Sequence, residues 1–341
     1  MGVKLQELMD AETVELARMS SQTIAIDAFN TIYQFLSIIR QRDGTPLMDA
    51  RGNVTSHLSG LFYRTVKLYE AGIRPCYVFD GPPPPFKMVA EERAARKAVA
   101  TEKLEDAKVR GDWEAVHKYA QQTAKLEPYM IKGAQRLLET MGVPWVQAPS
   151  EGEAQAAFMA REGVVWAAAS QDFDALLFGA PRLLRNVTVT GKRKVPRKQV
   201  YVEVRPEVID LGANLNRLGL SQTKLRLMGL LIGTDYNPGG VKGIGPKKAY
   251  DMVKNKNESE VLEELKRDWK SEWADPETLL DFFTAPPVVD VRPAWKNPDS
   301  ERLLGLLVDE HGFSQNRVES SVVAFTACMD KGAQGHLDKW F

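Results

Sequence analysis

Cysteine, histidine and long apolar runs are all scarce in this sequence. Its 341 residues include 2 cysteines and 4 histidines. Cys76 and Cys328 are too few and too far apart to form a disulfide framework or a zinc site, which favours a reducing compartment. No stretch approaches the roughly 20 consecutive apolar residues that span a bilayer. The composition therefore predicts a soluble intracellular protein with no membrane partner.

An excess of charge of either sign is also lacking. The 45 lysines and arginines balance the 45 aspartates and glutamates, so the formal net charge is zero. The overall charge therefore gives no indication of a nucleic-acid partner. Any contact with nucleic acid must come from local basic patches.

Patterns typical of strands and helices alternate through the first half of the chain. Such alternation indicates an α/β fold in which helices flank a mostly parallel sheet. The predicted strands span 23–27, 75–80, 143–146 and 164–170, and the predicted helices span 54–71, 129–141 and 152–162.

An unusual insertion separates the second predicted strand from the helix that follows it. Prolines occupy 82–85, and residues 86–127 are polar, charged and helix-favouring except at Gly111 and Asp112. We expect a helical hairpin that projects from the sheet. The alternative is a solvated surface excursion without a function, which charged runs commonly are.

A second hairpin, made of strands, is predicted at 183–204, where hydrophobic and polar residues alternate around a basic turn. Helices and loops are expected from there to about residue 330. The tip of this strand hairpin carries Lys192, Arg193, Lys194, Arg197 and Lys198.

Aspartates stand at or just beyond the ends of the predicted strands. Asp27 follows TIAI, Asp80 follows CYVF, and Asp172 and Asp174 lie just past VVWAAAS. In an open parallel sheet the carboxyl ends of the strands form the crevice where ligands bind. Acids gathered there repel one another unless cations share the site, and oxygen ligands select hard ions such as Mg²⁺ or Mn²⁺. The pattern predicts a metal-dependent enzyme that acts on phosphates.

A pair of glutamates, Glu151 and Glu153, lies in the segment PSEGEAQAAF. Ser150 and Glu153 have the spacing of a helix capping box, which explains Glu153 as a structural residue. Glu151 has no such role, and both side chains can face one site at the start of a helix. Alone, each acidic pair is commonly a surface feature. Together with Asp27 and Asp80 the pairs favour a metal site.

The stretch GLLIGTDYNPGGVKGIGPKKAYDMV predicts a helix, a glycine-rich turn and a second helix that begins at Pro246. Backbone amides at the start of that second helix can hold a phosphate. Lysines concentrate at the same turn, which makes an ordinary glycine-rich connector the weaker interpretation. The residues expected to grip a duplex backbone are Lys242, Gly243, Gly245, Lys247 and Lys248.

These segments together resemble a known family. In order and spacing, the whole chain is similar to the archaeal-type flap structure-specific endonucleases of the 5′-nuclease superfamily, which includes the XPG and Rad2 proteins. The motifs that carry the resemblance are IAIDAFNTIYQFL, VFDGPPPPFK, PSEGEAQAA, SQDFDALLFG and GTDYNPGGVKGIGPKKA.

The resemblance implies a PIN-like 5′-nuclease fold in a single nuclease domain over 1–330. The family's core would occupy 1–80 and 129–220, a helical arch would occupy 81–128, and a helix-two-turn-helix module would occupy about 221–255. A C-terminal helical region would span 256–330, and a clamp-binding tail would span 331–341. The arch would admit a free 5′ single strand and exclude an intact duplex.

The resemblance also implies the site residues. Seven carboxylates would hold two Mg²⁺ ions, with Mn²⁺ as a substitute, and Lys87 would approach the scissile phosphate. Arg93 would be its basic partner; Ala94 stands at the family's usual position, and Arg96 is the alternative. Tyr33 would stack on a base near the cut, although a core aromatic is an equal interpretation. The implied metal carboxylates are Asp27, Asp80, Glu151, Glu153, Asp172, Asp174 and Asp235.

Further implications concern partners. Branched or flap DNA would be bound by shape, with residues near 40–60 as a hydrophobic wedge and a K⁺ ion at the helix-two-turn-helix. The C-terminal QGHLDKWF matches a sliding-clamp (PCNA) box through Gln334, Leu337, Trp340 and Phe341. The protein would be a monomer in the cytoplasm or nucleoid of an archaeal-type cell.

The resulting hypothesis is a structure-specific 5′-flap endonuclease with 5′–3′ exonuclease activity, acting in Okazaki-fragment maturation and DNA repair. A sibling nuclease that resects ends, opens bubbles or resolves junctions is the near alternative. A nonenzymatic clamp-associated DNA-binding protein and a small-molecule phosphohydrolase are the other classes. The retained acids argue against the first of these. The basic turns and the clamp box have no purpose in the second.

Overall fold

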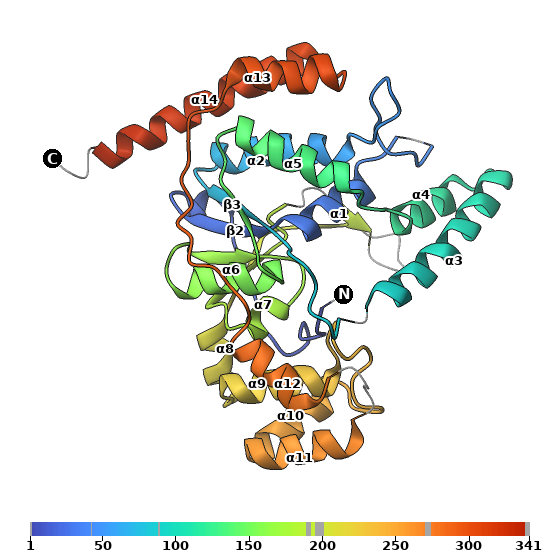
Figure 1. Ribbon diagram of the computed structural model, residues 1–341, viewed down its shortest axis with the longest axis vertical. Coiled ribbons are helices and arrows are strands. Elements are labelled where there is room, and N and C mark those ends of the chain that lie inside the picture. Colours follow the sequence, from blue (N-terminus) through green and yellow to red (C-terminus); the bar gives the residue numbers. More distant parts are fainter. Residues whose placement is uncertain are drawn as a thin grey trace.

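A seven-stranded sheet forms the centre of the molecule (Figure 1). The computed structural model describes residues 2–41, 43–87, 89–188, 192–194, 201–269 and 274–337. The sheet order is β1-β9-β6-β5-β2-β3-β4. Its strands are β1 (Glu12–Thr13), β2 (Thr23–Asp27), β3 (Arg74–Phe79), β4 (Trp145–Gln147), β5 (Ala167–Ala169), β6 (Arg182–Arg185) and β9 (Glu207–Asp210).

The predicted parallel core is confirmed. Strands β6, β5, β2, β3 and β4 pair in parallel, whereas β9 pairs antiparallel with β6 and with β1. Asp27 lies opposite Val78, and Ile26 lies opposite Ala169. The carboxyl ends of β5, β2 and β3 therefore reach the same edge of the sheet, where the aspartates follow.

Side chains alternate across the sheet because successive residues of a strand point to opposite faces. In β2, Ile24 and Ile26 join one hydrophobic cluster and Ala25 joins the other. A layer of helices covers each face (Figure 1). Within the described residues, no helix has both the length and the apolar character of a membrane span.

The helical layers draw on different parts of the chain. One contains α1 (Ala28–Ile38), α2 (Ser56–Glu70), α5 (Pro128–Thr140), α13 (Ser300–Leu304), the π-helix η2 (Gly305–Glu310) and α14 (Gln315–Leu337), with the 3₁₀ turn η1 (Leu16–Met19) beside it. The other contains α6 (Gly152–Arg161), α7 (Asp174–Leu177), α8 (Leu211–Leu218), α9 (Gln222–Ile232), α10 (Pro246–Asn255), α11 (Glu258–Asp268) and α12 (Pro276–Thr284).

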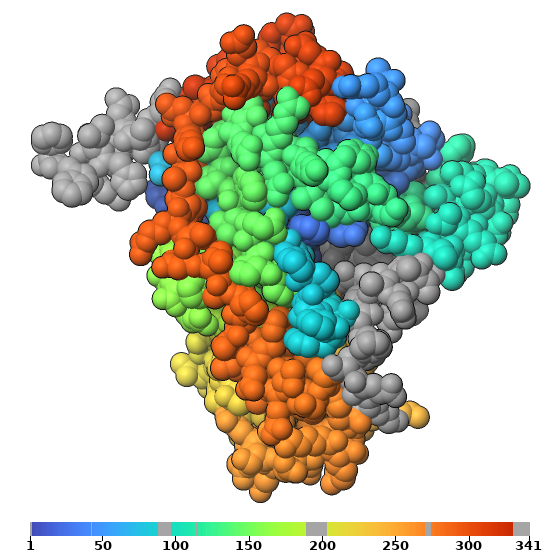
Figure 2. All heavy atoms as spheres, viewed as in Figure 1, coloured from blue at the N-terminus to red at the C-terminus, as the bar shows by residue number. Residues whose placement is uncertain are grey.

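The predicted helical hairpin is present and projects from one side of the body (Figure 2). Its helices are α3 (Val89–Val109) and α4 (Trp113–Gln122). Gly111 takes a φ of +66° at the turn, and Asp112 caps α4 by accepting a hydrogen bond from the Ala115 amide. Leu104 and Ala107 pack against Val116 in a small core of their own. The polar run is therefore a built hairpin with an interior.

The predicted strand hairpin at 183–204 is partly wrong. Residues 182–185 form β6 of the central sheet, and only β7 (Lys192–Lys194) and β8 (Tyr201–Glu203) pair as a separate hairpin. Leu183 and Leu184 are fully buried, so the apolar residues serve the main core. Lys192, Arg193 and Lys194 consequently lie in a strand and not at the tip. Arg197 and Lys198 lie outside the described residues.

The contact between α1 and α2 leaves no room for a side chain at Gly60. A Cβ atom there would lie 2.2 Å from Cγ of Phe35. We expect Gly60→Ala to lower the free energy of unfolding by about 1–3 kcal/mol, because overpacking a close contact forces neighbours to shift. Denaturant unfolding followed by circular dichroism measures this change.

Gly212 in α8 provides the matched control. A Cβ there meets only Oδ1 of Asp210, at 3.5 Å, which is ordinary contact. Gly212→Ala should leave stability unchanged or raise it by up to about 1 kcal/mol through helix propensity. Equal midpoints for Gly60→Ala and the wild type would contradict the packing of α1 on α2.

Candidate active site

Three neighbouring parallel strands deliver aspartates to one edge of the sheet. Asp27 is the last residue of β2, and Asp80 is the first residue after β3. Asp172 and Asp174 follow β5, and Asp174 begins the short helix α7. The sequence predicts this convergence correctly, because the polarity of a parallel sheet places all such residues on the same side.

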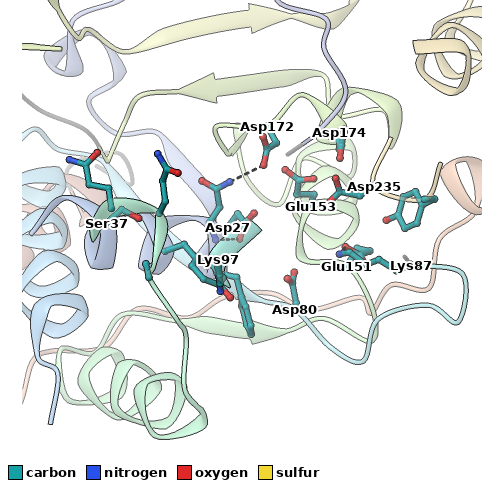
Figure 3. A pocket seen from close by; sticks show the side chains of 17 residues that line it. Asp27, Ser37, Asp80, Lys87, Lys97, Glu151, Glu153, Asp172, Asp174 and Asp235 are labelled. Carbon is teal, nitrogen blue, oxygen red and sulfur yellow. Dashed lines mark hydrogen bonds and ion pairs between the residues drawn. The ribbon is translucent and has the colours of Figure 1, made fainter. Parts of the chain in front are cut away.

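All the predicted carboxylates line one cleft with a volume of about 420 Å³ (Figure 3). The two glutamates come from the start of α6, and Asp235 comes from the loop after α9. The labelled acids point from different elements toward a shared space (Figure 3). The acids of the cleft are Asp27, Asp80, Glu151, Glu153, Asp172, Asp174 and Asp235.

Backbone amides hold several of these carboxylates in place. Oδ1 of Asp27 accepts a hydrogen bond from the Asn30 amide at 2.9 Å, because Asp27 is also the N-cap of α1. Oδ1 of Asp80 accepts from the Gly152 amide at 2.7 Å. The glycine is needed at 152, since a Cβ there would lie 2.6 Å from that oxygen. These bonds fix the acids and partly offset their charge.

The first residues of the chain contribute to the cleft, which the sequence reasoning missed. The Gly2 amide donates to Oδ1 of Asp172 at 3.1 Å, and the Val3 amide donates to Oδ1 of Asp174 at 2.7 Å. A Cβ at Gly2 would lie 2.8 Å from atoms of both aspartates. Asn30 adds a side-chain bond to Oδ2 of Asp172 at 3.1 Å. No sequence pattern links segments about 170 residues apart.

The predicted capping box is wrong. Helix α6 begins at Gly152, its N-cap is Glu151, and no side chain caps it. Oε1 of Glu153 accepts a hydrogen bond from the hydroxyl of Ser170 at 2.7 Å. Glu153 is therefore turned toward the end of β5 and not back along its own helix. This orientation favours the alternative interpretation, in which both glutamates serve the site.

Lys87 lies inside the cleft and pairs with Glu151. Its Nζ is 2.6 Å from Oε2 of Glu151, and the two side chains are only 19% and 10% exposed. Burial disfavours the charged amine, but Glu151 and the nearby Asp80 outweigh burial and raise the pKa of Lys87 above its ordinary value. The lysine is therefore held as a cation beside the acids.

An aromatic cluster fixes the segment that carries Lys87 to the segment that carries Asp235. Phe86 packs edge-to-face on Tyr236, with ring centres 5.7 Å apart, and on Phe282 at 5.2 Å. Tyr236 is 3% exposed. Phe86 precedes Lys87 and Tyr236 follows Asp235 in the sequence, and Phe282 packs against both aromatic rings. Lys87 and Asp235 are thus held by a common apolar anchor.

Asn237 shapes the loop that presents Asp235. Its side-chain oxygen accepts from the Thr234 amide at 3.0 Å and hydroxyl at 2.7 Å, while its Nδ2 donates to the carbonyl of Leu230 at 2.7 Å. Gly233 and Gly240 approach so closely that a Cβ at Gly233 would lie 2.5 Å from the Gly240 amide nitrogen. The glycines allow the loop to close, and Asn237 satisfies its buried polar groups.

The cleft is electrostatically strained by its own acids. Burial, with neighbouring carboxylates, raises the pKa of Asp27 and of Glu153 well above the ordinary range. Burial likewise raises the pKa of Asp174 to about 7. Protons or cations must therefore share the space.

The donor set fits a hard divalent cation. All candidate ligands are carboxylate oxygens, which suit Mg²⁺ or Mn²⁺. Within the described residues, no three acidic, histidine or cysteine side chains converge tightly enough to hold an ion by themselves. Mg²⁺ usually keeps several water ligands and takes only one or two carboxylates directly. The cleft therefore suits ions that several of the acids contact through water.

The helical hairpin of α3 and α4 contributes a lysine that the sequence reasoning did not single out. Lys97 of α3 lines the cleft, and its Nζ lies 5.4 Å from the ring centre of Tyr33 on α1. Tyr33 is half-buried and also lines the cleft, which favours the site interpretation over the core interpretation. The backbone of Arg93 and Arg96 is helical, but their side chains lie outside the described ones. Lys97 lies about one helical turn after Ala94, the position at which the family resemblance implies a basic residue.

The glycine-rich module forms as predicted. Helices α9 and α10 flank the turn, Gly245 is the N-cap of α10, and Pro246 is its first residue. Gly243 takes a φ of +80°, which favours glycine. Lys242, Lys247 and Lys248 are all exposed there. The turn thus presents exposed lysines at an uncapped helix start.

The C-terminal box is described only in part. Helix α14 continues to Leu337, so the backbone of Gln334 and Leu337 is helical. The described end of α14 extends away from the sheet (Figure 1). The side chains of Gln334 and Leu337 are not among those described, and Trp340 and Phe341 lie outside the described residues.

Two family models and curated relatives match this chain. The XPG N-terminal domain matches residues 1–102, and the XPG I-region matches residues 142–235. Flap endonuclease 1 of Thermococcus onnurineus is 50% identical over 343 residues, which cover 100% of this chain and 99% of that protein.

Solved structures give the same result. Flap endonuclease-1 from Methanococcus jannaschii superposes with a TM-score of 0.76 at 38% identity, covering 97% of this chain and 99% of that one. The catalytic core of Rad2 in complex with DNA substrate shares the fold, with a TM-score of 0.68 at 22% identity over 95% of this chain and all of that one. The chain therefore belongs to the flap endonuclease 1 group of the XPG family.

Proposed function

We propose that this protein, a nuclease of the flap endonuclease 1 group, hydrolyses phosphodiester bonds of 5′-flap DNA near the junction of single strand and duplex. The products are a 5′-phosphate and a 3′-hydroxyl. The observation that carries the proposal is the convergence of seven acids from distant segments on one cleft that also holds Lys87. Okazaki-fragment maturation and DNA repair are the processes that require this reaction.

The acids of the cleft would hold two Mg²⁺ ions, with Mn²⁺ as a substitute. Bound there, the ions would activate the attacking water and stabilise the leaving 3′ oxygen. Burial and neighbouring carboxylates raise the pKa values of Asp27, Glu153 and Asp174, and these shifts support a role for the three acids in cation binding. Asp80 and Asp235 lie toward the side occupied by Lys87.

Lys87 supplies a fixed positive charge for the scissile phosphate. A phosphate oxygen that enters the cleft competes with Glu151 for Nζ, and a preorganised cation lowers the cost of charge that develops in the transition state. Lys97 lies at the cleft wall beside Tyr33. There a base can stack on the Tyr33 ring and Lys97 can contact a phosphate. Arg93 remains the predicted second arch residue.

The lysines at the α10 turn support the gripping of duplex DNA. Lys242, Lys247 and Lys248 flank the open amides at the start of α10, where a phosphate binds without sequence readout. Carbonyl groups of the preceding loop would hold a K⁺ ion. Lys192, Arg193 and Lys194 in β7 are additional candidates for phosphate contact.

The remaining proposals concern assembly. The C-terminal box would dock on a sliding clamp (PCNA), with Leu337, Trp340 and Phe341 as its apolar residues. The protein would act as a monomer in the cytoplasm or nucleoid of an archaeal-type cell. Incubation with labelled flap, fork, nicked and four-way DNA, with and without Mg²⁺, tests the substrate class directly. Preferential cleavage of the four-way junction would contradict flap specificity.

Asp172→Ala should lower the cleavage rate by at least about 100-fold, by analogy with the loss of one preorganised charge partner. Flap binding should persist, because one negative charge fewer in the cleft weakens no phosphate contact. Single-turnover cleavage and fluorescence anisotropy measure the two properties separately. Asp281→Asn on α12, an exposed acid outside the cleft, is the control. Wild-type turnover by Asp172→Ala would remove that acid from the mechanism.

Mg²⁺ should raise the melting temperature, and by more at pH 8 than at pH 6. Asp174, with a pKa of about 7, is ionised in the folded state at the higher pH and largely protonated at the lower one. Protons therefore compete with the ion as pH falls. We expect an increase of about 2–5 °C at pH 8, measured by calorimetry with KCl at equal ionic strength as the control. Equal increases at both pH values would contradict cation binding by these acids.

Deletion of residues 334–341 should abolish stimulation of cleavage by a sliding clamp and spare the basal rate. The deleted segment would supply the apolar contacts to the clamp, whereas the cleft lies elsewhere. Cleavage assays with and without the clamp measure both rates. Lys339→Ala, at a spacer position of the box, should keep full stimulation. A collapse of basal cleavage would instead make the tail part of the fold.

A further inference from the structure

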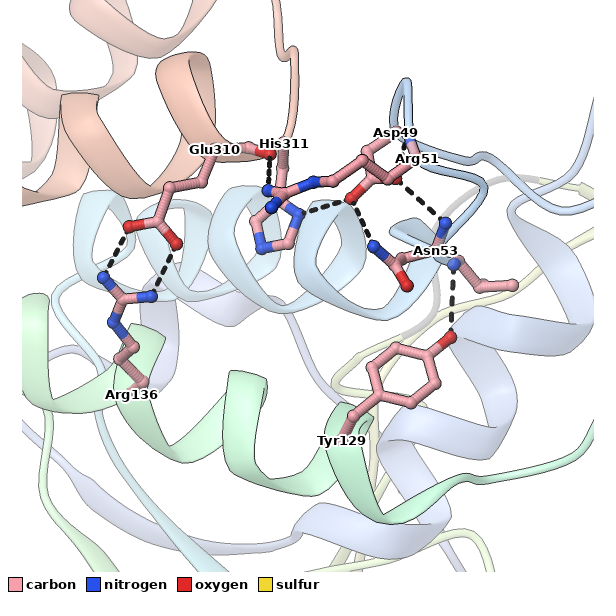
Figure 4. Close-up of polar contacts among 8 residues, drawn as sticks. Asp49, Arg51, Asn53, Tyr129, Arg136, Glu310 and His311 are labelled. Atoms are coloured by element: carbon pink, nitrogen blue, oxygen red, sulfur yellow. Dashed lines mark hydrogen bonds and ion pairs between the residues drawn. The ribbon is translucent and has the colours of Figure 1, made fainter.

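The loop at 40–54, whose residue 42 lies outside the described residues, lies between the helical hairpin of α3 and α4 and the C-terminal helices. It contains short antiparallel bridges between Arg40 and Pro46 and between Met48 and Val54. On one side, Gly44 faces α4, where an added Cβ would lie 3.0 Å from a methyl group of Val116. On the other side, residues 48–54 meet Glu310 and His311 at the end of η2 (Figure 4). We call α13, η2 and α14 together the C-terminal unit. We call residues 48–54 the 48–54 turn.

Asp49 organises the 48–54 turn from within. Oδ1 accepts hydrogen bonds from the Arg51 and Asn53 amides, each at 2.9 Å, and Oδ2 accepts from Nδ2 of Asn53 at 3.0 Å. The side chain is only 1% exposed. These hydrogen bonds lower the pKa of Asp49 well below its ordinary value, so the buried carboxylate is ionised.

His311 meets this carboxylate from the far end of the sequence. Its Nδ1 lies 3.1 Å from Oδ2 of Asp49, although the two residues are 262 positions apart. Arg51 adds a second bond between the 48–54 turn and η2, because its Nη2 donates to the carbonyl of Glu310 at 2.8 Å. The carboxylate of Glu310 in turn accepts both ends of the Arg136 guanidinium on α5, at 2.6 Å each. The 48–54 turn is therefore tied to η2 and α5 (Figure 4).

The mounted loop carries exposed apolar side chains. Met48 is 48% exposed, and Ile38, at the end of α1 just before the loop, is 56% exposed. Large apolar groups on a rigid support suit contact with the flat face of a base pair at a branch point. The same loop faces α4, whose helical hairpin lines part of the cleft through Lys97 and Gln122. The position of the loop therefore affects both its contact with the DNA branch point and its contact with α4.

We propose that Asp49 and His311 are positioning residues that fix the loop at 40–54 for branched DNA, so that the C-terminal helical unit sets substrate affinity from outside the cleft. The inference rests on the proposed function, because it assumes a branched DNA substrate. Neither residue touches the reacting phosphate. Their loss should therefore weaken binding and leave the chemical step nearly intact.

The test compares Asp49→Asn, His311→Ala and the double variant. Each single variant should weaken the Kd for flap DNA by about tenfold, the effect of losing a hydrogen bond to a charged group. The double variant should be little worse than either one, because both remove the same contact. Single-turnover cleavage at saturating enzyme should change by less than about threefold. Hydrogen exchange at residues 48–54 should accelerate in all three.

Two further variants separate positioning from general stability. His311→Gln keeps a side-chain N–H donor and should recover most of the affinity that His311→Ala loses. Asp281→Asn, which changes an exposed carboxylate on α12 outside the 40–54 loop, should bind flap DNA as the wild type does. Unchanged Kd values in both Asp49→Asn and His311→Ala would overturn the proposal, as would failure of His311→Gln to restore binding.

The same assays keep the proposal apart from the proposed function. Wild-type protein that binds and cleaves flap DNA, while the variants bind equally well, contradicts the positioning role alone. Wild-type protein that neither binds nor cleaves flap DNA contradicts the proposed function, and the positioning role falls with it.

Discussion

Repulsion among buried carboxylates is the constraint on which the rest of this structure depends. Gathering acids where burial already disfavours charge is costly, and raised pKa values at Asp27, Glu153 and Asp174 express that cost. The fold offsets part of it with backbone amides, from Asn30 to Asp27 and from Gly152 to Asp80. A hard divalent cation would relieve the repulsion among the carboxylates that remains. A stable but inert protein would gain nothing from such a cluster.

The support for these acids lies mostly in the next layer of residues. The amides of Gly2 and Val3 donate to Asp172 and Asp174, which lie 170 and 171 positions away in the sequence. The aromatic contact of Phe86 with Tyr236 fixes the Lys87 and Asp235 segments to each other. Glycines at the closest approaches leave room for these contacts. The site is therefore placed by tight packing as well as by strand polarity, and that packing fixes the acids before any ligand is present.

The sequence predicts what depends on periodicity and strand polarity. The parallel core and the strand-end aspartates follow from apolar runs and from the place where each run ends. The helical hairpin follows from the polar, helix-favouring run at 86–127. Asp235 ends no strand, so its membership of the site could be inferred only from family resemblance. Strands β1 and β9 have 2 and 4 residues, too short to give a periodic signal. The error at 183–204 has the same origin, because alternation alone does not reveal which partner a strand selects.

Contacts between distant segments are invisible to pattern analysis for a further reason. The capping box at Ser150 and Glu153 is a valid local solution, but Ser170 offers Glu153 a hydrogen bond that the local solution cannot include. Likewise, nothing near Asp49 announces His311. Local rules specify the elements, and tertiary contacts then choose among the roles that local rules leave open.

An extended segment joins the helical layers that flank the sheet. Residues 286–299 lead from α12 to α13 with neither helix nor strand (Figure 1). The Gln155 side chain bonds both backbone groups of Val289, and the indole of Trp295 donates to the Pro75 carbonyl at 3.0 Å. The Lys296 amide bonds the Gly142 carbonyl close to β4, the last strand of the sheet. The segment therefore tethers α6, the sheet and α5 in turn. Because α6 carries two acids of the cleft and the C-terminal unit holds the 48–54 turn, this tether connects the cleft to the 48–54 turn through one continuous segment.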